Sequence, residues 1–259
     1  MGFPIGVTGR QGLGRGRVWE FFALVVGMMV GLAGCNNSPY PAGAADSNTL
    51  YTAFNERSPR YLDPTSSYSS NETPYTYQIY EPLYGYHYLK RPYTLVPKTA
   101  AAVVQPRYLG RDGKTLPDSA PADQIVESVY DIPIKRGVLF APHPAFAKNA
   151  QGEYLYHRLT AEQVADKRSP WAFEQTGTRE LVADDFVYAI KRHATTRTAA
   201  PVFGIFSEYV VGLADYGKLI RAEDKKLRAS VPPTSKDKPF LDFRKWPLAG
   251  AQALDSHTL

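Results

Sequence analysis

Cysteine is nearly absent from this sequence: the 259 residues contain one, Cys35, so a disulfide within the chain is impossible. Histidine is also scarce. The five histidines show neither paired i,i+4 spacing nor a His-Glu-x-x-His run, which are common patterns of zinc ligands. The sequence therefore predicts no metal site, and we expect no other cofactor.

Recognisable enzyme motifs are missing as well. A Gly-x-Ser-x-Gly run, the commonest signal of a serine hydrolase, does not occur. Residues 110–115 place two residues between their glycines, where a phosphate-binding loop needs four. Asp112-Gly113 is instead typical of a hairpin turn, because glycine adopts a positive φ at no steric cost. We expect no catalytic residues and no enzymatic activity.

Long runs of positive charge are also absent, which argues against nucleic acid as a partner. The whole chain has a formal net charge of +5. Residues 1–34 hold three arginines and one glutamate, so the chain without them would carry +3. The part that follows residue 34 is therefore only mildly basic.

The N-terminal residues have the pattern of an export signal. Arg10, Arg15 and Arg17 precede an apolar run of about a dozen residues, 21–32, which is too short to span a bilayer comfortably. The run leads into Leu-Ala-Gly-Cys35, which resembles a bacterial lipobox. We predict a lipoprotein signal peptide at 1–34, lipidation of the Cys35 thiol, and a flexible tether at 35–48. The protein is then expected in the periplasm or cell envelope, held in a lipid bilayer by acylated Cys35.

Residues 181–193 form the clearest predicted helix. Its first turn contains Asp184 and Asp185, and its last turn contains Lys191 and Arg192, where the helix dipole favours charges of these signs. One apolar face at helical spacing is expected to pack against a sheet; it consists of Phe186, Ala189, Ile190 and His193.

This helix belongs to a longer sequence pattern that begins in the segment upstream of it. Residues 134–140 read Ile-Lys-Arg-Gly-Val-Leu-Phe. Together with the helix they resemble the signature of extracellular solute-binding proteins of family 5, the peptide and nickel class that serves ABC transporters. Gly137, Phe140, Asp185 and Arg192 are among the matching positions. The sequence departs at Val182, where the family usually has a helix-capping threonine; the loss of that cap costs about 1 kcal/mol.

Further blocks match this family in the same order. A predicted first strand at 49–54 is followed by Leu62-Asp63-Pro64, as in the family. Thr73-Pro74 then predicts the start of a helix that Pro82 closes, and residues 78–84 resemble the Ile-Tyr-Glu-x-Leu run of the family. The resemblance covers residues 49–259.

The remaining local patterns predict short elements. Residues 96–109 are expected to be extended and 126–134 to form the returning strand, which leads into the signature. Thr160-Ala-Glu-Gln163 is a capping box that predicts a short helix. Residues 206–229 predict one long helix, broken after Val231-Pro-Pro.

The resemblance implies an α/β fold of the periplasmic-binding-protein-like kind, class II. Residues 49–84 and 181–259 would form an incomplete first lobe, and 85–180 a small inserted β-rich domain. The second lobe would be missing, since the chain is about half the usual family length.

The resemblance also implies a function and a site. The protein would be a lipid-anchored substrate-binding component that captures peptides of the oligopeptide or dipeptide class for ABC permease subunits of the inner membrane. The family places backbone contacts to its ligand in the polar loop between the first strand and the first helix. Here that loop contains Tyr68, Ser69, Ser70, Asn71 and Glu72.

Two other functions remain open at this point. One is a lipid-anchored hydrolase, which would need a nucleophile–base pair that the sequence does not reveal. The other is a non-functional truncated fragment of a binding protein.

Overall fold

The computed structural model describes residues 57–232 and 239–259, with residues 22, 24–26, 43 and 48 further towards the N-terminus. Cys35, nearly all of the predicted signal peptide and tether, and the predicted strand at 49–54 lie outside these residues. The chain divides into two units, residues 1–55 and 56–259. The second unit is described below. None of the described helices is long and apolar enough to cross a membrane.

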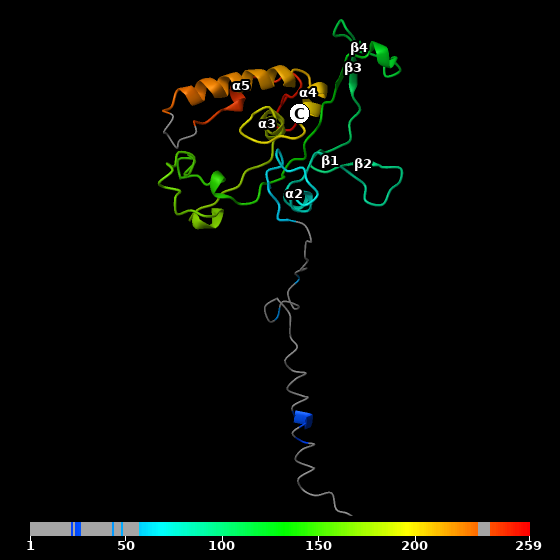
Figure 1. Cartoon of the computed structure of the whole chain (residues 1–259). Helices are drawn as coiled ribbons and strands as arrows, with labels where there is room; N and C mark the ends of the chain where they lie inside the picture. Colours follow the sequence, from blue (N-terminus) through cyan, green and yellow to red (C-terminus); the bar gives the residue numbers. More distant parts are fainter. Residues whose placement is uncertain (1–21, 23, 27–42, 44–47, 49–56, 233–238) are drawn as a thin grey trace, which may run out of the picture. The chain divides into compact units, whose positions relative to one another are not determined.

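The described residues of the second unit contain four α-helices: α2 (Thr73–Ile79), α3 (Ala183–Arg192), α4 (Phe203–Tyr209) and α5 (Leu213–Ala229) (Figure 1). The helix predicted to start at Thr73-Pro74 is confirmed, although it ends at Ile79, before Pro82. The helix predicted at 181–193 is also confirmed, with aspartates in the first turn of α3 and basic residues in its last. The single helix predicted at 206–229 is wrong. Gly212 separates α4 from α5, and its φ of 76° is a left-handed conformation that favours glycine.

In the part of the chain that the structure describes, five short strands form two small antiparallel sheets (Figure 1). In the first, β1 (Tyr84–Tyr86) pairs with β2 (Leu95–Pro97). In the second, β3 (Arg107–Leu109) lies between β4 (Thr115–Leu116) and β5 (Glu127–Val129). The predicted turn at Asp112-Gly113 is confirmed: Gly113 has a φ of 73°, and its N–H donates to the Gly110 carbonyl at 3.0 Å.

Single turns of 3₁₀ helix complete the regular structure: η2 (Ala122–Gln124), η3 (Pro144–Phe146), η4 (Pro170–Ala172) and η5 (Phe243–Lys245). The capping box at 160–163 forms both of its hydrogen bonds. The Thr160 N–H donates to Gln163 Oε1 at 2.8 Å, and the Gln163 N–H donates to Thr160 Oγ1 at 3.3 Å. The helix predicted to follow is wrong, because residues 161–166 form turns only.

The two signature segments lie side by side. The Leu181 N–H donates to the Val138 carbonyl at 2.8 Å, and the Phe140 N–H donates to the Arg179 carbonyl at 3.0 Å. Further along, His143 and Gly177 exchange two backbone hydrogen bonds. An irregular antiparallel ladder therefore leads from the Gly137 segment directly into α3.

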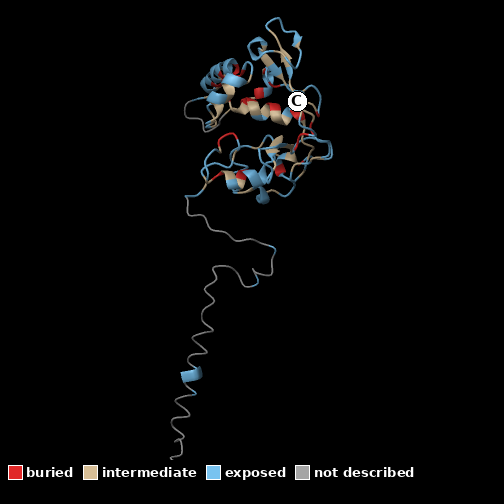
Figure 2. Cartoon of the chain, turned by 90° about the vertical axis from the view of Figure 1, so that its right-hand side faces the viewer, coloured by how far each residue is buried: buried red, intermediate tan, exposed pale blue. Residues whose placement is uncertain are grey.

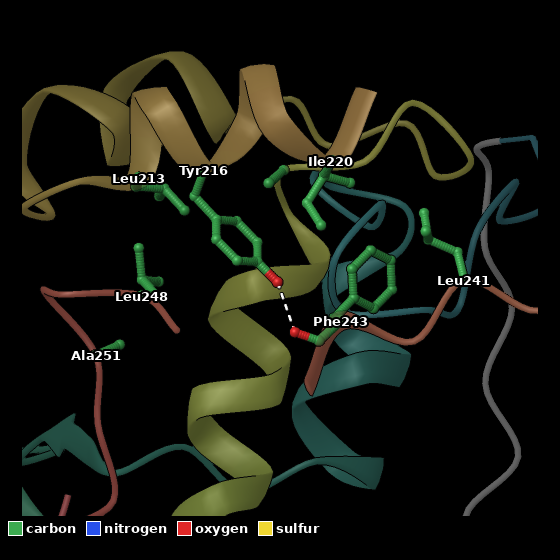
Figure 3. Packing of buried hydrophobic residues seen from close by; sticks show 8 residues of the cluster. Leu213, Tyr216, Ile220, Leu241, Phe243, Leu248 and Ala251 are labelled. Carbon is green, nitrogen blue, oxygen red and sulfur yellow. Dashed lines mark hydrogen bonds between the residues drawn. The ribbon is translucent and has the colours of Figure 1, made fainter. Parts of the chain in front are cut away.

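The main apolar core is built on α5. Leu213, Tyr216 and Ile220 are buried on one face of the helix, at the spacing of helical turns. They pack with residues of the C-terminal segment, among them Leu248 and Phe243, and the Tyr216 hydroxyl donates to the Phe243 carbonyl at 2.8 Å (Figure 3). Elsewhere, Figure 2 shows buried residues scattered among exposed ones.

The predicted packing of α3 is wrong in two respects. Its buried residues are Ala183, Val187 and Lys191, whereas Ala189 of the predicted face is exposed. The helix packs against η5 of the C-terminal segment, not against a sheet. The buried Lys191 places its ammonium group 5.8 Å from the centre of the Tyr216 ring, a distance at which a cation is attracted to the ring. Burial lowers the pKa of Lys191.

Candidate functional site

A cavity of about 680 Å³ lies against the loop that precedes α2. Four of the five residues predicted to bind ligand line it, namely Tyr68, Ser69, Asn71 and Glu72, and Ser70 is not among the lining residues. Sequence reasoning missed the other lining residues, which are Arg57, Ser58, Pro59, Arg60, Tyr61, Ser66 and Pro201.

Glu72 organises the wall of this cavity. Its side chain is almost fully buried, with a relative exposure of 2%. The backbone N–H groups of Arg60 and Tyr61 donate to Oε1 at 3.1 and 2.9 Å. Those of Tyr68 and Ser69 donate to Oε2 at 3.0 and 3.3 Å. One carboxylate therefore ties residues 60–61 to residues 68–69.

This arrangement holds Glu72 in its charged form. Burial by itself raises the pKa of a carboxyl group, because a charge loses its hydration. The hydrogen bonds donated by the backbone of Tyr61, Tyr68 and Ser69 act in the opposite direction and outweigh burial, so the pKa of Glu72 falls to about 2. Glu72 is thus an anion at neutral pH whose two oxygens are already occupied.

The backbone donors of the predicted loop are largely used within the protein. The Tyr68 and Ser69 N–H groups serve Glu72. The Asn71 side chain donates to the Arg57 and Ser58 carbonyls at 2.9 and 3.2 Å. The resemblance assigns ligand contacts to this backbone, and that assignment stays a prediction. These bonds give the cavity wall a fixed shape before any ligand arrives.

Two exposed arginines give the cavity its positive charge. Arg57 and Arg60 both line the cavity and are exposed. Within residues 57–232 and 239–259, no carboxylate forms an ion pair with either guanidinium group; the Arg60 group lies 5.8 Å from the centre of the Tyr61 ring. Since the negative charge of Glu72 is turned inward, the cavity presents positive charge beside the exposed Tyr68 ring.

An ion pair fixes this loop to helix α3. Arg192 donates from both terminal nitrogens to the Asp63 carboxylate, with Nη1 to Oδ1 at 3.0 Å. Burial raises the pKa of Asp63, but the hydrogen bond from Arg192 and that from the Thr65 backbone lower it more, and the net shift is downward. The Asp63 carbonyl in turn accepts from Ser66, a cavity residue, at 3.0 Å. Two blocks of the family resemblance, 129 residues apart, therefore meet next to a residue that lines the cavity.

The cap missing at Val182 is supplied by its neighbours. The Val182 N–H donates to Asp185 Oδ2 at 2.9 Å, which is the reverse half of a capping box. The Val182 side chain has no acceptor, so the Asp185 N–H instead donates to the Val182 carbonyl at 3.0 Å, and the Ala183 N–H donates to the Ser256 carbonyl at 2.9 Å. Arg179 donates to Asp185 Oδ2 at 2.8 Å and lies over the Phe140 ring at 4.7 Å. The start of α3 is thereby held to the Gly137 segment and to the C-terminal segment.

A chain of polar side chains lies near the same helix end. Ser256 Oγ is 2.9 Å from His257 Nδ1, and His257 Nε2 is 3.1 Å from Glu180 Oε1. Glu180 also accepts from the Gly137 N–H at 2.5 Å. Sequence reasoning missed this serine–histidine–glutamate contact because Glu180 lies 77 residues before His257 and no motif joins them.

Metal binding finds no support in the described part of the chain, where no group of three or more histidine, cysteine, aspartate or glutamate side chains could hold an ion.

Comparison with protein families, with curated proteins and with solved structures found no match to this chain.

Proposed function

We propose that this protein is the lipid-anchored substrate-binding component of an ABC importer and that it captures peptides in the cavity beside residues 57–72. The observation that carries this proposal is the position of the cavity. It lies against residues 68–72, the loop to which the family resemblance assigns ligand contacts. The ion pair between Asp63 and Arg192 adds support, since it joins two of the resembling blocks. Permease subunits of the inner membrane are the proposed partners, and no catalytic step is involved.

The charge of the cavity indicates which end of a peptide it takes. A guanidinium group binds a carboxylate through two parallel N–H donors. Arg57 and Arg60 are the exposed cations of the cavity, so they would receive the C-terminal carboxylate of the peptide. The exposed Tyr68 ring offers apolar contact to side chains of varied shape.

We expect the affinity to be low. Most residues that line the cavity are exposed, so each hydrogen bond to a ligand replaces one to water and contributes about 1 kcal/mol. Several such bonds must exceed an association cost of at least about 4 kcal/mol. A Kd of about 1 mM is the expected result for this chain.

Saturation-transfer NMR suits this range of affinity. The full chain is mixed with trialanine or with its C-terminal amide, both at millimolar concentration. Trialanine is expected to receive clearly more magnetisation than the amide. The double variant Arg57→Ala/Arg60→Ala should lose this preference, whereas Arg111→Ala, an exposed arginine outside the cavity, should keep it. No transfer to any peptide from the parent chain would contradict the proposed function.

The proposed anchor has its own test. Cys35 is the only cysteine, so acylation of the protein at a thiol can occur nowhere else. Two or three acyl chains are needed for stable attachment, because one chain binds a membrane only marginally. Cells that express the protein should yield a membrane-bound form whose mass includes the lipid, and Cys35→Ser should release the protein or block its processing. An unmodified Cys35 in the mature protein would refute the anchor.

A hydrolase is the second candidate, because the Ser256–His257–Glu180 contacts resemble a nucleophile, base and orienting acid. An activated serine reacts with fluorophosphonate probes. Labelling of the full chain that disappears in Ser256→Ala would favour this candidate. Absence of labelling would leave the contacts with a structural role only, which is to tie the C-terminal segment to the start of α3.

A further inference from the structure

The loop that joins β1 to β2 exposes large apolar side chains. We call residues 86–95 the hairpin tip. Within it, Tyr88 and Leu89 have relative exposures of 88% and 76%, and Tyr86 and Tyr93 are also well exposed. Side chains of this size are costly to leave in water, and a contiguous exposed group of them is a common mark of an interaction surface.

The hairpin tip carries charge of only one sign. Lys90 and Arg91 lie between its apolar residues, and Lys98 follows just after β2. Residues 82–98 contain no aspartate or glutamate. The surface therefore combines three tyrosines and two leucines, Leu89 and the partly exposed Leu95, with a local positive charge, although the part of the chain that follows residue 34 is only mildly basic.

The tip has a defined conformation. The His87 N–H donates to the Thr94 carbonyl at 2.8 Å, which closes the loop. The His87 ring accepts at Nδ1 from the N–H groups of Leu89 and Lys90, both at 3.2 Å. The Arg91 guanidinium lies 4.6 Å from the centre of the Tyr93 ring. These contacts use the backbone and the flanking residues, and they leave Tyr88 and Leu89 uncovered.

We propose that the hairpin tip binds the surface of an anionic lipid bilayer, as a membrane contact separate from the acyl anchor. Tyrosine is enriched at the interface of membranes, where its ring lies in the apolar region and its hydroxyl stays hydrated. Lysine and arginine are attracted to anionic headgroups. A stable protein partner would bury about 800 Å² on each side, which is more than a short hairpin loop provides. The composition and the size of the tip therefore favour lipid.

A fluorophore placed in the tip tests this locally. In the full chain with Cys35→Ser, no other cysteine remains, so Thr94→Cys can be labelled with an environment-sensitive dye while the apolar and basic residues of the tip stay in place. Vesicles of phosphatidylcholine with about one third phosphatidylglycerol should shift its emission to the blue, and pure phosphatidylcholine should do so much less. Because the attraction is partly electrostatic, about 0.5 M salt should reduce the shift.

Two comparisons make the result specific. A dye at Tyr209→Cys, an exposed position on α4, should show no shift with the same vesicles. Reversal of charge in Lys90→Glu/Arg91→Glu should weaken the response of the Thr94 dye about tenfold or more, with an unchanged circular dichroism spectrum. An absent shift on anionic vesicles, an equal shift at position 209, or an unchanged response of the charge-reversed variant would each overturn the proposal.

Discussion

The cavity loop and the α5 core lie in one unit but are stabilised by different interactions. Residues 57–72 are held by carboxylates: Glu72 accepts four backbone N–H groups, and Asp63 pairs with Arg192. The α5 core is held mainly by the packing of Leu213, Ile220 and their neighbours, to which Tyr216 adds a side-chain hydrogen bond to the Phe243 carbonyl. Hydrogen bonds to a carboxylate fix the geometry of their donors closely, but they depend on the charge of the carboxylate and therefore on pH. Apolar packing is insensitive to pH. The fixed polar wall therefore suits recognition, and the apolar core supplies the stability behind it.

The largest effect is expected from a cavity made in the core. Ile220 has a relative exposure of 0%, so Ile220→Ala removes packing that nothing replaces. We expect a loss of about 2–5 kcal/mol in the free energy of unfolding, measured by urea denaturation. The matched change Leu219→Ala, at a neighbouring position that is 38% exposed, should cost much less. Equal losses in both variants would contradict the position of the core.

A smaller effect is expected when the ion pair between Asp63 and Arg192 is broken. The side chains of Arg192 and Asp63 are 29% and 34% exposed, so solvent screens them in part. Arg192→Ala should lower the free energy of unfolding by about 1–2 kcal/mol and should increase hydrogen exchange in residues 57–72. Exchange in α5 should stay unchanged, and a uniform increase across both regions would mean that they are not separable.

The hydrogen bond inside the core should contribute less again. Tyr216→Phe keeps the ring but leaves the Phe243 carbonyl without this donor. We expect a loss of about 1 kcal/mol by thermal or urea unfolding. Tyr209→Phe, which alters an exposed tyrosine, serves as the control and should have no measurable effect.

The last effect appears only in acid. The pKa of Glu72 is about 2 in the folded protein against 4.5 for an ordinary glutamate, so its contribution is complete above pH 4.5 and is lost as the pH falls towards 2. The protection factors of the Tyr61, Tyr68 and Ser69 amides, which compare their exchange with the intrinsic rate at each pH, should fall over that range in the parent chain. Glu72→Gln should remove this pH dependence, whereas Glu81→Gln, an exposed neighbour, should retain it. A parent loop that is equally protected at both ends of the range would refute the role given to Glu72.

Local patterns predicted the elements whose causes are local. The charges at the two ends of α3 and the glycine at the 112–113 turn act within a few residues, and both predictions are confirmed. The division between α4 and α5 also has a local signal, namely Gly212 inside the predicted helix. The prediction of one long helix gave this glycine no weight. The lobe and inserted domain implied by the resemblance remain predictions.

The candidate site depends on long-range contacts, which no spacing in the sequence reveals. Sequence reasoning named the loop that lines the cavity. It could not show that Glu72 faces inward, because its partners at residues 60–61 are placed by the fold of the whole loop. It also missed Arg57 and Arg60, since two exposed arginines have no distinctive pattern until a cavity lies beside them.

Hydrogen exchange of the full chain with and without saturating trialanine tests for a peptide site at the cavity, because it reports on the two regions in one experiment. We expect added protection within residues 57–72 and none in α5 or the C-terminal segment. The same experiment on Arg57→Ala/Arg60→Ala should show no added protection at all. Protection confined to α5, or protection of the loop that survives the double substitution, would contradict a peptide site at this cavity.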